Sequence, residues 1–149
     1  MHREDKYPDT KYFKFHNSNP KNKYTTDCVI RALSTALNKD YNTVVIDLAQ
    51  LHCKLGLDVS DPKLYNKYLE QNGWSKCKQP RQPDGTKITG KEFCELLQFW
   101  KHKPTAYNRI IAHIGSGHIV AIIDGKILDT WNSSEGCIGN FWIEQTLES

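Results

Sequence analysis

The chain has 149 residues, of which 38% are hydrophobic and 25% are charged, and its formal net charge is +3 at pH 7. This length suits a single domain over residues 1–149, and the absence of any run of about eighteen apolar residues excludes a membrane-spanning helix. The N-terminus lacks the apolar stretch of a secretory signal peptide, so we expect a cytoplasmic protein with no membrane partner.

Residues 1–24 form a basic and aromatic N-terminal arm. They hold six Lys or Arg against three acidic residues. Their aromatic residues are Tyr7, Tyr12, Phe13, Phe15 and Tyr24. Such a mixture can bind single-stranded nucleic acid, or it can form an arm or short strand that packs on the core. The low net charge favours packing, so we expect no nucleic-acid partner.

Asp27 and Cys28 mark the start of the first long helix. Asp27 is a good N-cap residue, and Val29 and Leu33 begin an apolar face that continues to Leu37 at helical spacing. Cys28 therefore lies in the first helical turn, where unpaired N–H groups and the positive end of the helix dipole favour a thiolate. A cysteine in this position is either a buried packing residue or a nucleophile.

Three more helices are predicted, over residues 44–55, 61–73 and 89–104. Their start and stop signals are Gly56, Asp61-Pro62, Gly73, Thr89 and Pro104. Short β-branched or aromatic runs follow at 107–114, 118–123, 126–131 and 141–146, and Trp74–Cys77 is a further possible strand. Helices followed by antiparallel strands indicate an α+β fold.

The other four cysteines, at 53, 77, 94 and 137, form no C-x-x-C pair with each other or with Cys28. The odd total of five cysteines and their irregular spacing indicate reduced thiols rather than a disulfide framework. Because structural zinc sites usually show paired ligand spacing, we expect no metal and no other cofactor.

His118 begins a predicted hairpin whose turn is Asp124-Gly125. If the loop has two residues, His118 and Asp129 lie on one face as diagonal neighbours, about 7–8 Å apart at the backbone. If the loop has three residues, Asn132 instead lies opposite His118 and Asp129 turns to the other face. The register of the hairpin therefore decides which side chain orients the imidazole.

The order Cys28, His118, Asp129 resembles that of papain-like cysteine peptidases. Asp129-Thr130-Trp131 is similar to the Asn-Ser-Trp of papain. The resemblance implies a papain-like fold, in which N-terminal helices, including the helix of the nucleophile, pack on a C-terminal antiparallel sheet. It also implies that Cys28, His118 and Asp129 are catalytic and that Trp131 shields the His–Asp hydrogen bond.

The branch that processes bacteriocins offers a closer comparison around the cysteine. It carries Gln six residues before the Cys and Asp just before it; this chain has Asn22 and Asp27 at those places, and Val29 where Gly is common. The resemblance implies an oxyanion hole formed by Asn22 and the backbone of Cys28. The string Asp-Cys-Val-Ile-Arg-Ala also resembles small proteins of bacterial and phage genomes.

These residues predict an amide hydrolase, most simply a peptidase that acts on a protein or peptide through a thioester. Cys28 would attack as a thiolate, His118 would transfer the proton, and Asp129 would fix the imidazole tautomer. A glutamine deamidase or acyl transferase would use the same three residues. A protein- or nucleic-acid-binding module without catalysis is the alternative of a different class.

Overall fold

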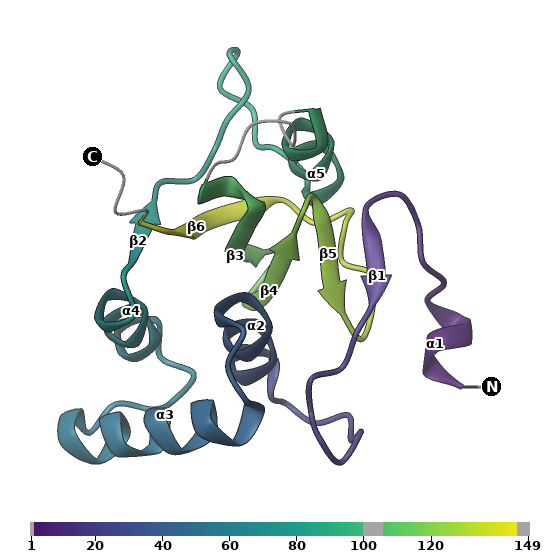
Figure 1. The fold of residues 1–149 in the computed structure, drawn as a ribbon. Coiled ribbons are helices and arrows are strands. Elements are labelled where there is room, and N and C mark those ends of the chain that lie inside the picture. Colours follow the sequence, from purple (N-terminus) through teal and green to yellow (C-terminus); the bar gives the residue numbers. More distant parts are fainter. Residues whose placement is uncertain (1, 100–105, 146–149) are drawn as a thin grey trace.

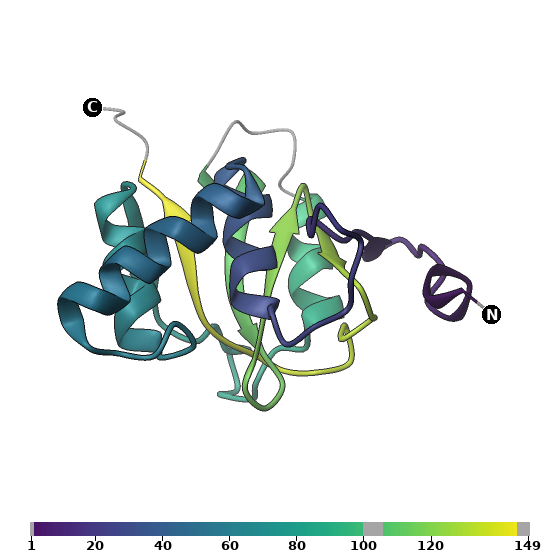
Figure 2. The same ribbon diagram turned by 90° about the horizontal axis from the view of Figure 1, so that it is seen from below.

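The computed structural model of the chain describes residues 2–99 and 106–145. In them, a six-stranded sheet has α2, α3 and α4 on one face and α5 on the other (Figures 1 and 2), which confirms the α+β class. The helices are α1 (Arg3–Lys6), α2 (Cys28–Leu37), α3 (Tyr41–Leu55), α4 (Pro62–Gln71), α5 (Gly90–Phe99) and a short 3-10 turn, Ala106–Asn108. The strands are β1 (Phe13–Phe15), β2 (Trp74–Cys77), β3 (Arg109–Ile114), β4 (His118–Ile123), β5 (Lys126–Asp129) and β6 (Ile138–Glu144).

The sheet is mixed rather than purely antiparallel. Its strand order is β1-β5-β4-β3-β6-β2, and every neighbouring pair is antiparallel except β1 with β5. The prediction of an antiparallel sheet is therefore wrong at this edge, because the N-terminal arm adds Phe13–Phe15 as a parallel strand. Phe13 is fully buried in the core, so the interpretation of the arm as a packed strand is confirmed at this point.

Each face of the sheet carries its own apolar cluster. On one side, Ile111 and Ile119 pack with residues of α2, α3 and α4, whereas on the other side Ile110 and Val120 pack with residues of α5. Neighbouring strand residues alternate between the two clusters because successive side chains point to opposite faces of a sheet. The helix of Cys28 is thereby packed against the middle of the sheet, beside β4.

Most of the predicted helix signals act as expected. The Asp61 side chain accepts a hydrogen bond from the Lys63 backbone N–H at 2.9 Å, and Gly56 ends α3 at a φ of 71°. Thr89 and Glu92 cap the start of α5 reciprocally, with Glu92 N donating to Thr89 Oγ1 at 3.1 Å. The predicted end of this last helix, at 100–104, lies outside the described residues.

The helices and strands differ from their predicted extents in a few places. In α3, Val44, Leu48 and Leu51 are buried, but Val45 and Leu55 remain exposed because the helix lies at the margin of the molecule (Figure 1). The strand predicted for 126–131 ends at residue 129, and the strand predicted for 141–146 begins earlier, at residue 138. Its last predicted residue, 146, lies outside the described part of the chain.

The β4–β5 hairpin has the two-residue turn that Asp124-Gly125 predicts. Asp124 and Gly125 have φ values of 51° and 78°, and Ile123 pairs directly with Lys126. This pairing rules out the three-residue loop. The turn also lies close to α5, since Gln98 Nε2 donates to the Gly125 carbonyl at 2.9 Å.

We predict that Gly125→Ala destabilises the protein more than Gly85→Ala does. Both glycines have left-handed φ values, which cost a side chain about 1 kcal/mol or more. A Cβ at Gly125 would also lie 2.5 Å from Gln98 Cγ and 3.2 Å from the Cys94 carbonyl, whereas a Cβ at Gly85 would meet nothing within 4 Å. Urea unfolding should show a loss of about 2–3 kcal/mol for Gly125→Ala against about 1 for Gly85→Ala. Equal losses would contradict the close approach of α5 to the turn.

Candidate functional site

The start of α2 brings Cys28 against the start of β4. The Cys28 thiol is partly buried, and the His118 side chain and the backbone N–H of Ile119 lie near enough to stabilise its negative charge. It also lies in the first turn of the helix, where the backbone N–H groups have no partner within the helix. The sulfur is thus surrounded by groups that stabilise its anionic form.

His118 and Asp129 are joined as the two-residue turn predicts. His118 Nε2 lies 2.6 Å from Asp129 Oδ2, and Asp129 is only 2% exposed. Because Nε2 is engaged by the carboxylate, Nδ1 is the ring nitrogen left to interact with the Cys28 thiol. The structure therefore brings the three predicted catalytic residues together, with His118 between Asp129 and Cys28.

Trp131 and Asn132 lie close by but have different environments. The Trp131 ring lies over the His118 imidazole, with 4.8 Å between the ring centroids and 39° between the planes. Asn132 Oδ1 accepts a hydrogen bond from the Ser134 backbone N–H at 3.0 Å and so stabilises the turn after β5. Asp129, not Asn132, orients the histidine, because the observed hairpin register places Asp129 beside it.

The structure does not bring Asn22 to the sulfur. Asn22 is exposed in a turn, with a φ of 53°, and its N–H donates to the Asn19 carbonyl at 2.9 Å. Its side chain borders a hollow of ≈ 510 Å³ beside α1, together with Arg3 and Tyr24. Among the described residues, no hydrogen bond joins Asn22 to Cys28, so the oxyanion-hole role of Asn22 stays a prediction.

Asp27 precedes α2 as predicted, but its side chain does not cap the helix. Its Oδ1 accepts a hydrogen bond from Arg31 Nε at 2.8 Å, and its Oδ2 accepts one from the Tyr41 hydroxyl at 2.5 Å. The capping interpretation is therefore wrong, because the buried guanidinium one turn later competes for the carboxylate. Burial opposes the negative charge of Asp27, but the Tyr41 and Arg31 hydrogen bonds outweigh it and lower the pKa of Asp27.

Arg31 is a site residue that the sequence interpretation missed. Its side chain is buried, and its Nη1 donates to Asp129 Oδ1 on a strand 98 positions along the chain. Asp27 and Arg31 are four residues apart, which is typical of an ion pair on one helix, and this spacing could have indicated Arg31 as a partner of Asp27. Nothing in the sequence indicated the contact with Asp129.

The pKa values of the thiol and the imidazole shift in opposite directions. The hydrogen bond from His118, the largest influence, outweighs burial and lowers the pKa of Cys28. Burial opposes the charge on His118, but the hydrogen bonds to Asp129 and Cys28 outweigh it and raise the pKa of His118 to about 9. These opposite shifts favour a thiolate–imidazolium ion pair.

A hollow of ≈ 240 Å³ opens beside His118 and is bordered by Trp131 and Asn132. Its other lining residues are Ile114, Gly115, Ser116, Ser133, Glu135 and Gly136. The Ser133 hydroxyl is buried and has no hydrogen-bond partner among the described residues. The volume is below the usual range for sites of drug-sized ligands, and it is suited to one side chain of a longer molecule.

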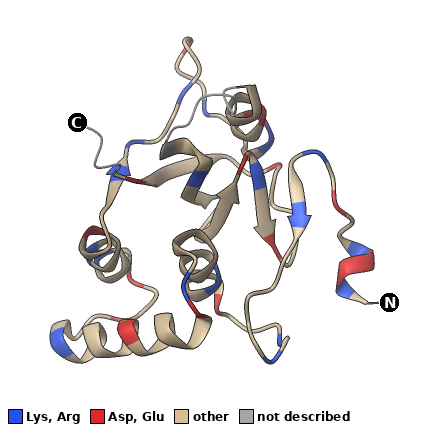
Figure 3. Ribbon diagram, viewed as in Figure 1, with Lys and Arg blue, Asp and Glu red and all other residues tan. Residues whose placement is uncertain are grey.

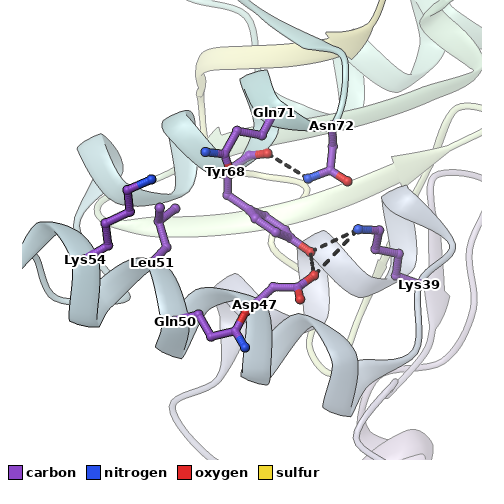
Figure 4. A pocket seen from close by; sticks show the side chains of 8 residues that line it. All are labelled: Lys39, Asp47, Gln50, Leu51, Lys54, Tyr68, Gln71 and Asn72. Carbon is purple, nitrogen blue, oxygen red and sulfur yellow. Dashed lines mark hydrogen bonds and ion pairs between the residues drawn. The ribbon is translucent and has the colours of Figure 1, made fainter.

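A further hollow, more polar than the one beside His118, lies between α3 and α4 (Figure 4). It has a volume of ≈ 360 Å³. The Tyr68 hydroxyl donates to Asp47 Oδ2 at 2.6 Å, and Lys39 Nζ lies 3.6 Å from the same oxygen. The central charged groups thus pair with each other, and neither Cys nor His lines this hollow. It offers no nucleophile.

Among residues 2–99 and 106–145, no group of three or more His, Cys, Asp or Glu side chains is placed to hold a metal ion. No helix in this part of the chain combines the length and apolar character needed to cross a membrane.

Comparisons with protein-family models, with curated proteins and with solved structures found no match to this chain. The function of the protein is therefore inferred from the geometry around Cys28.

We predict that His118→Ala slows alkylation of Cys28 by iodoacetamide at pH 7 by at least tenfold. Loss of the imidazolium raises the pKa of Cys28 and reduces the thiolate fraction. Peptide mapping by mass spectrometry would locate the label, with the buried thiol of Cys94, whose pKa burial raises to about 12, as an internal reference. The matched control is His52→Ala, because His52 is exposed on α3 and should leave the rate unchanged. Equal rates in both variants would contradict the Cys28–His118 pair.

Proposed function

We propose that the protein is a thiol-dependent amide hydrolase, most simply a peptidase with a papain-like fold. The observation that carries the proposal is the convergence of Cys28, His118 and Asp129: His118 Nε2 lies 2.6 Å from Asp129 Oδ2, and the imidazole stabilises the Cys28 thiolate. Nucleophile, base and orienting carboxylate are the three parts that thiol catalysis of acyl transfer requires. The resemblance in residue order to papain-like peptidases supports the same assignment.

The proposed reaction begins with the thiolate of Cys28 attacking the carbonyl carbon of an amide. The C–N bond breaks as the His118 imidazolium donates its proton to the departing amine, which leaves an acyl group on sulfur as a thioester. His118, now neutral, takes a proton from water, and the resulting hydroxide attacks the thioester to release the acid and regenerate the thiolate. Asp129 holds the imidazole in one orientation throughout and stabilises its charged form.

The backbone N–H of Cys28 is the proposed donor for the developing oxyanion. It lies at the N-terminus of α2, where N–H groups have no partner within the helix and the helix dipole favours negative charge. A donor of this kind contributes about 3 kcal/mol to the stabilisation of the transition state. The exposed turn of Asn22 would have to move to supply a second donor.

The partner we propose is a protein or peptide chain. The hollow beside His118, which Trp131 borders, would hold one residue on the leaving-group side of the scissile bond. Acidic and basic residues are interspersed along α1, α3 and α4 in Figure 3, in keeping with the expectation of no nucleic-acid partner.

We predict that Cys28→Ala abolishes turnover of a peptide library, with the folded state unchanged. The substitution removes the nucleophile from a partly buried position and keeps the helix, so circular dichroism and the melting temperature should remain close to those of the wild type. Mass spectrometry would separate the reactions, since hydrolysis yields new termini, glutamine deamidation adds about 1 Da, and acyl transfer adds the mass of a supplied amine.

The matched control is Cys53→Ala, because Cys53 is exposed on α3 and should keep full turnover. If the wild type yields none of the three products, or if Cys28→Ala retains them, the proposed function is wrong and a binding module becomes the better account. An unfolded Cys28→Ala variant would instead assign this thiol to packing.

Turnover should follow a bell-shaped pH dependence, and Asp129→Asn should narrow it from the alkaline side. The ion pair exists above the lowered pKa of Cys28 and below the raised pKa of His118, at about 9. Turnover is thus lost at acid pH, as the thiolate is protonated, and again as the pH rises through about 9. Since Asp129 raises the pKa of His118, its neutralisation should move the alkaline limb to lower pH. An alkaline limb that Asp129→Asn does not move would contradict the role of this carboxylate.

A further inference from the structure

Arg31 occupies a buried position between the carboxylates of Asp27 and Asp129. It lies on α2 one turn beyond Cys28, and its side chain is only 10% exposed. Its Nε donates to Asp27 Oδ1 at 2.8 Å, and its Nη1 donates to Asp129 Oδ1. A guanidinium is suited to such a bridge because its donors form a rigid planar fork.

We propose that Arg31 is a positioning residue of the site, which holds Asp129 so that one carboxylate oxygen is directed at His118. This inference rests on the proposed function. Arg31 keeps Cys28, His118 and Asp129 aligned by holding Asp129, and it does not contact the substrate.

The two oxygens of Asp129 are divided between two sets of partners. Oδ1 accepts hydrogen bonds from Arg31 Nη1 and from the Thr130 backbone N–H at 2.7 Å, while Oδ2 faces His118 Nε2 at 2.6 Å. A carboxylate held through one oxygen cannot rotate away from the imidazole. If the contact with Arg31 were lost, only the Thr130 N–H would hold Oδ1.

Arg31 also joins the helix of the nucleophile to the strand of the acid. Arg31 lies one turn after Cys28 on α2, whereas Asp129 ends β5, so this ion pair sets the position of the thiol helix relative to the hairpin. Arg31 itself is held from its other side by Asp27, which the Tyr41 hydroxyl of α3 orients at 2.5 Å. The guanidinium thus links α2 to β5 directly, and to α3 through Asp27.

The thiol interacts with His118, Arg31 and Tyr65 of α4, and the imidazole interacts with Cys28 and Asp129. The charged and titratable groups around Arg31 are Asp27 before α2, Tyr41 of α3, Asp129 of β5 and His16 after β1. Burial, with Lys14 and Arg31 nearby, lowers the pKa of His16, which keeps this imidazole uncharged at neutral pH. Arg31 is therefore the permanent cation of the group.

The test is the pH dependence of Cys28 alkylation by iodoacetamide in Arg31→Lys, which keeps the positive charge and loses the planar fork. We expect the acid limb of the rate to move up by about one pH unit, so that the rate on that limb falls about tenfold, because Asp129 is released and the imidazolium is stabilised less. The proton on His118 Nε2, which NMR detects far downfield when it is bonded to a carboxylate, should be lost or shifted.

The matched control is Arg109→Lys. Arg109 is another partly buried arginine attached to α2, through a 2.7 Å hydrogen bond from Nη1 to the Ala36 carbonyl at the far end of the helix. The Arg109→Lys substitution should change only the melting temperature. The alkylation profile and the NMR signal should be the same as in the wild type.

If Arg31→Lys does not fold, the double variant Asp27→Asn/Arg31→Met is used in its place. The double variant removes two buried groups of opposite charge together and not a single charge. A wild-type alkylation profile in either folded variant overturns the proposal. Failure of the proposed function gives a different result: the wild-type protein itself would then alkylate Cys28 no faster than Cys53, whatever the residue at position 31.

Discussion

The buried carboxylate of Asp129 is the group on which the rest of the site depends. Only 2% of this residue is exposed, and an isolated charge in such a place would cost several kcal/mol or more. It is compensated by Arg31, by His118 and by the Thr130 N–H, while its backbone carbonyl accepts from His16 N at 2.9 Å. Removing one partner of a buried pair typically costs about 3–5 kcal/mol, so this carboxylate links the stability of the fold to the geometry of the site.

This compensation explains how two distant parts of the chain form one site. The hairpin turn sets the register that places Asp129 beside His118, and the packing of α2 on the sheet brings Cys28 to the start of β4. The Trp131 ring then packs against the imidazole, with 4.8 Å between the ring centroids. The resulting environment lowers the pKa of the thiol and raises that of the imidazole, which is what a thiol nucleophile needs near neutral pH.

Local patterns were sufficient for much of the fold. The apolar spacing after Asp27, the capping residues Asp61 and Thr89, and the Asp124-Gly125 turn depend on residues close together in sequence, and the structure has helices and a hairpin at these places. The pairing of His118 with Asp129 followed from the turn type, because the length of the loop sets the register of both strands.

The unpredicted features depend on contacts between distant residues. The parallel pairing of β1 with β5 joins strands more than a hundred positions apart, and the contact of Arg31 with Asp129 spans 98. Asp27 is of a residue type common at helix N-caps, yet its carboxylate accepts a hydrogen bond from the buried Arg31 side chain instead. Asn22 follows a family spacing and lines the hollow beside α1, and its oxyanion-hole role stays a prediction. The spacing of residues in the sequence does not indicate which distant partner a side chain will contact in the fold.

The most direct measurement for this account is an NMR titration of the His118 imidazole in the wild type and in Cys28→Ala. The account predicts that His118 remains an imidazolium up to about pH 9 in the wild type, and that it loses its proton at lower pH once the thiolate is absent. An imidazole that titrates near 6.5 in both proteins would show that the sulfur and the histidine are not coupled, and would contradict the account.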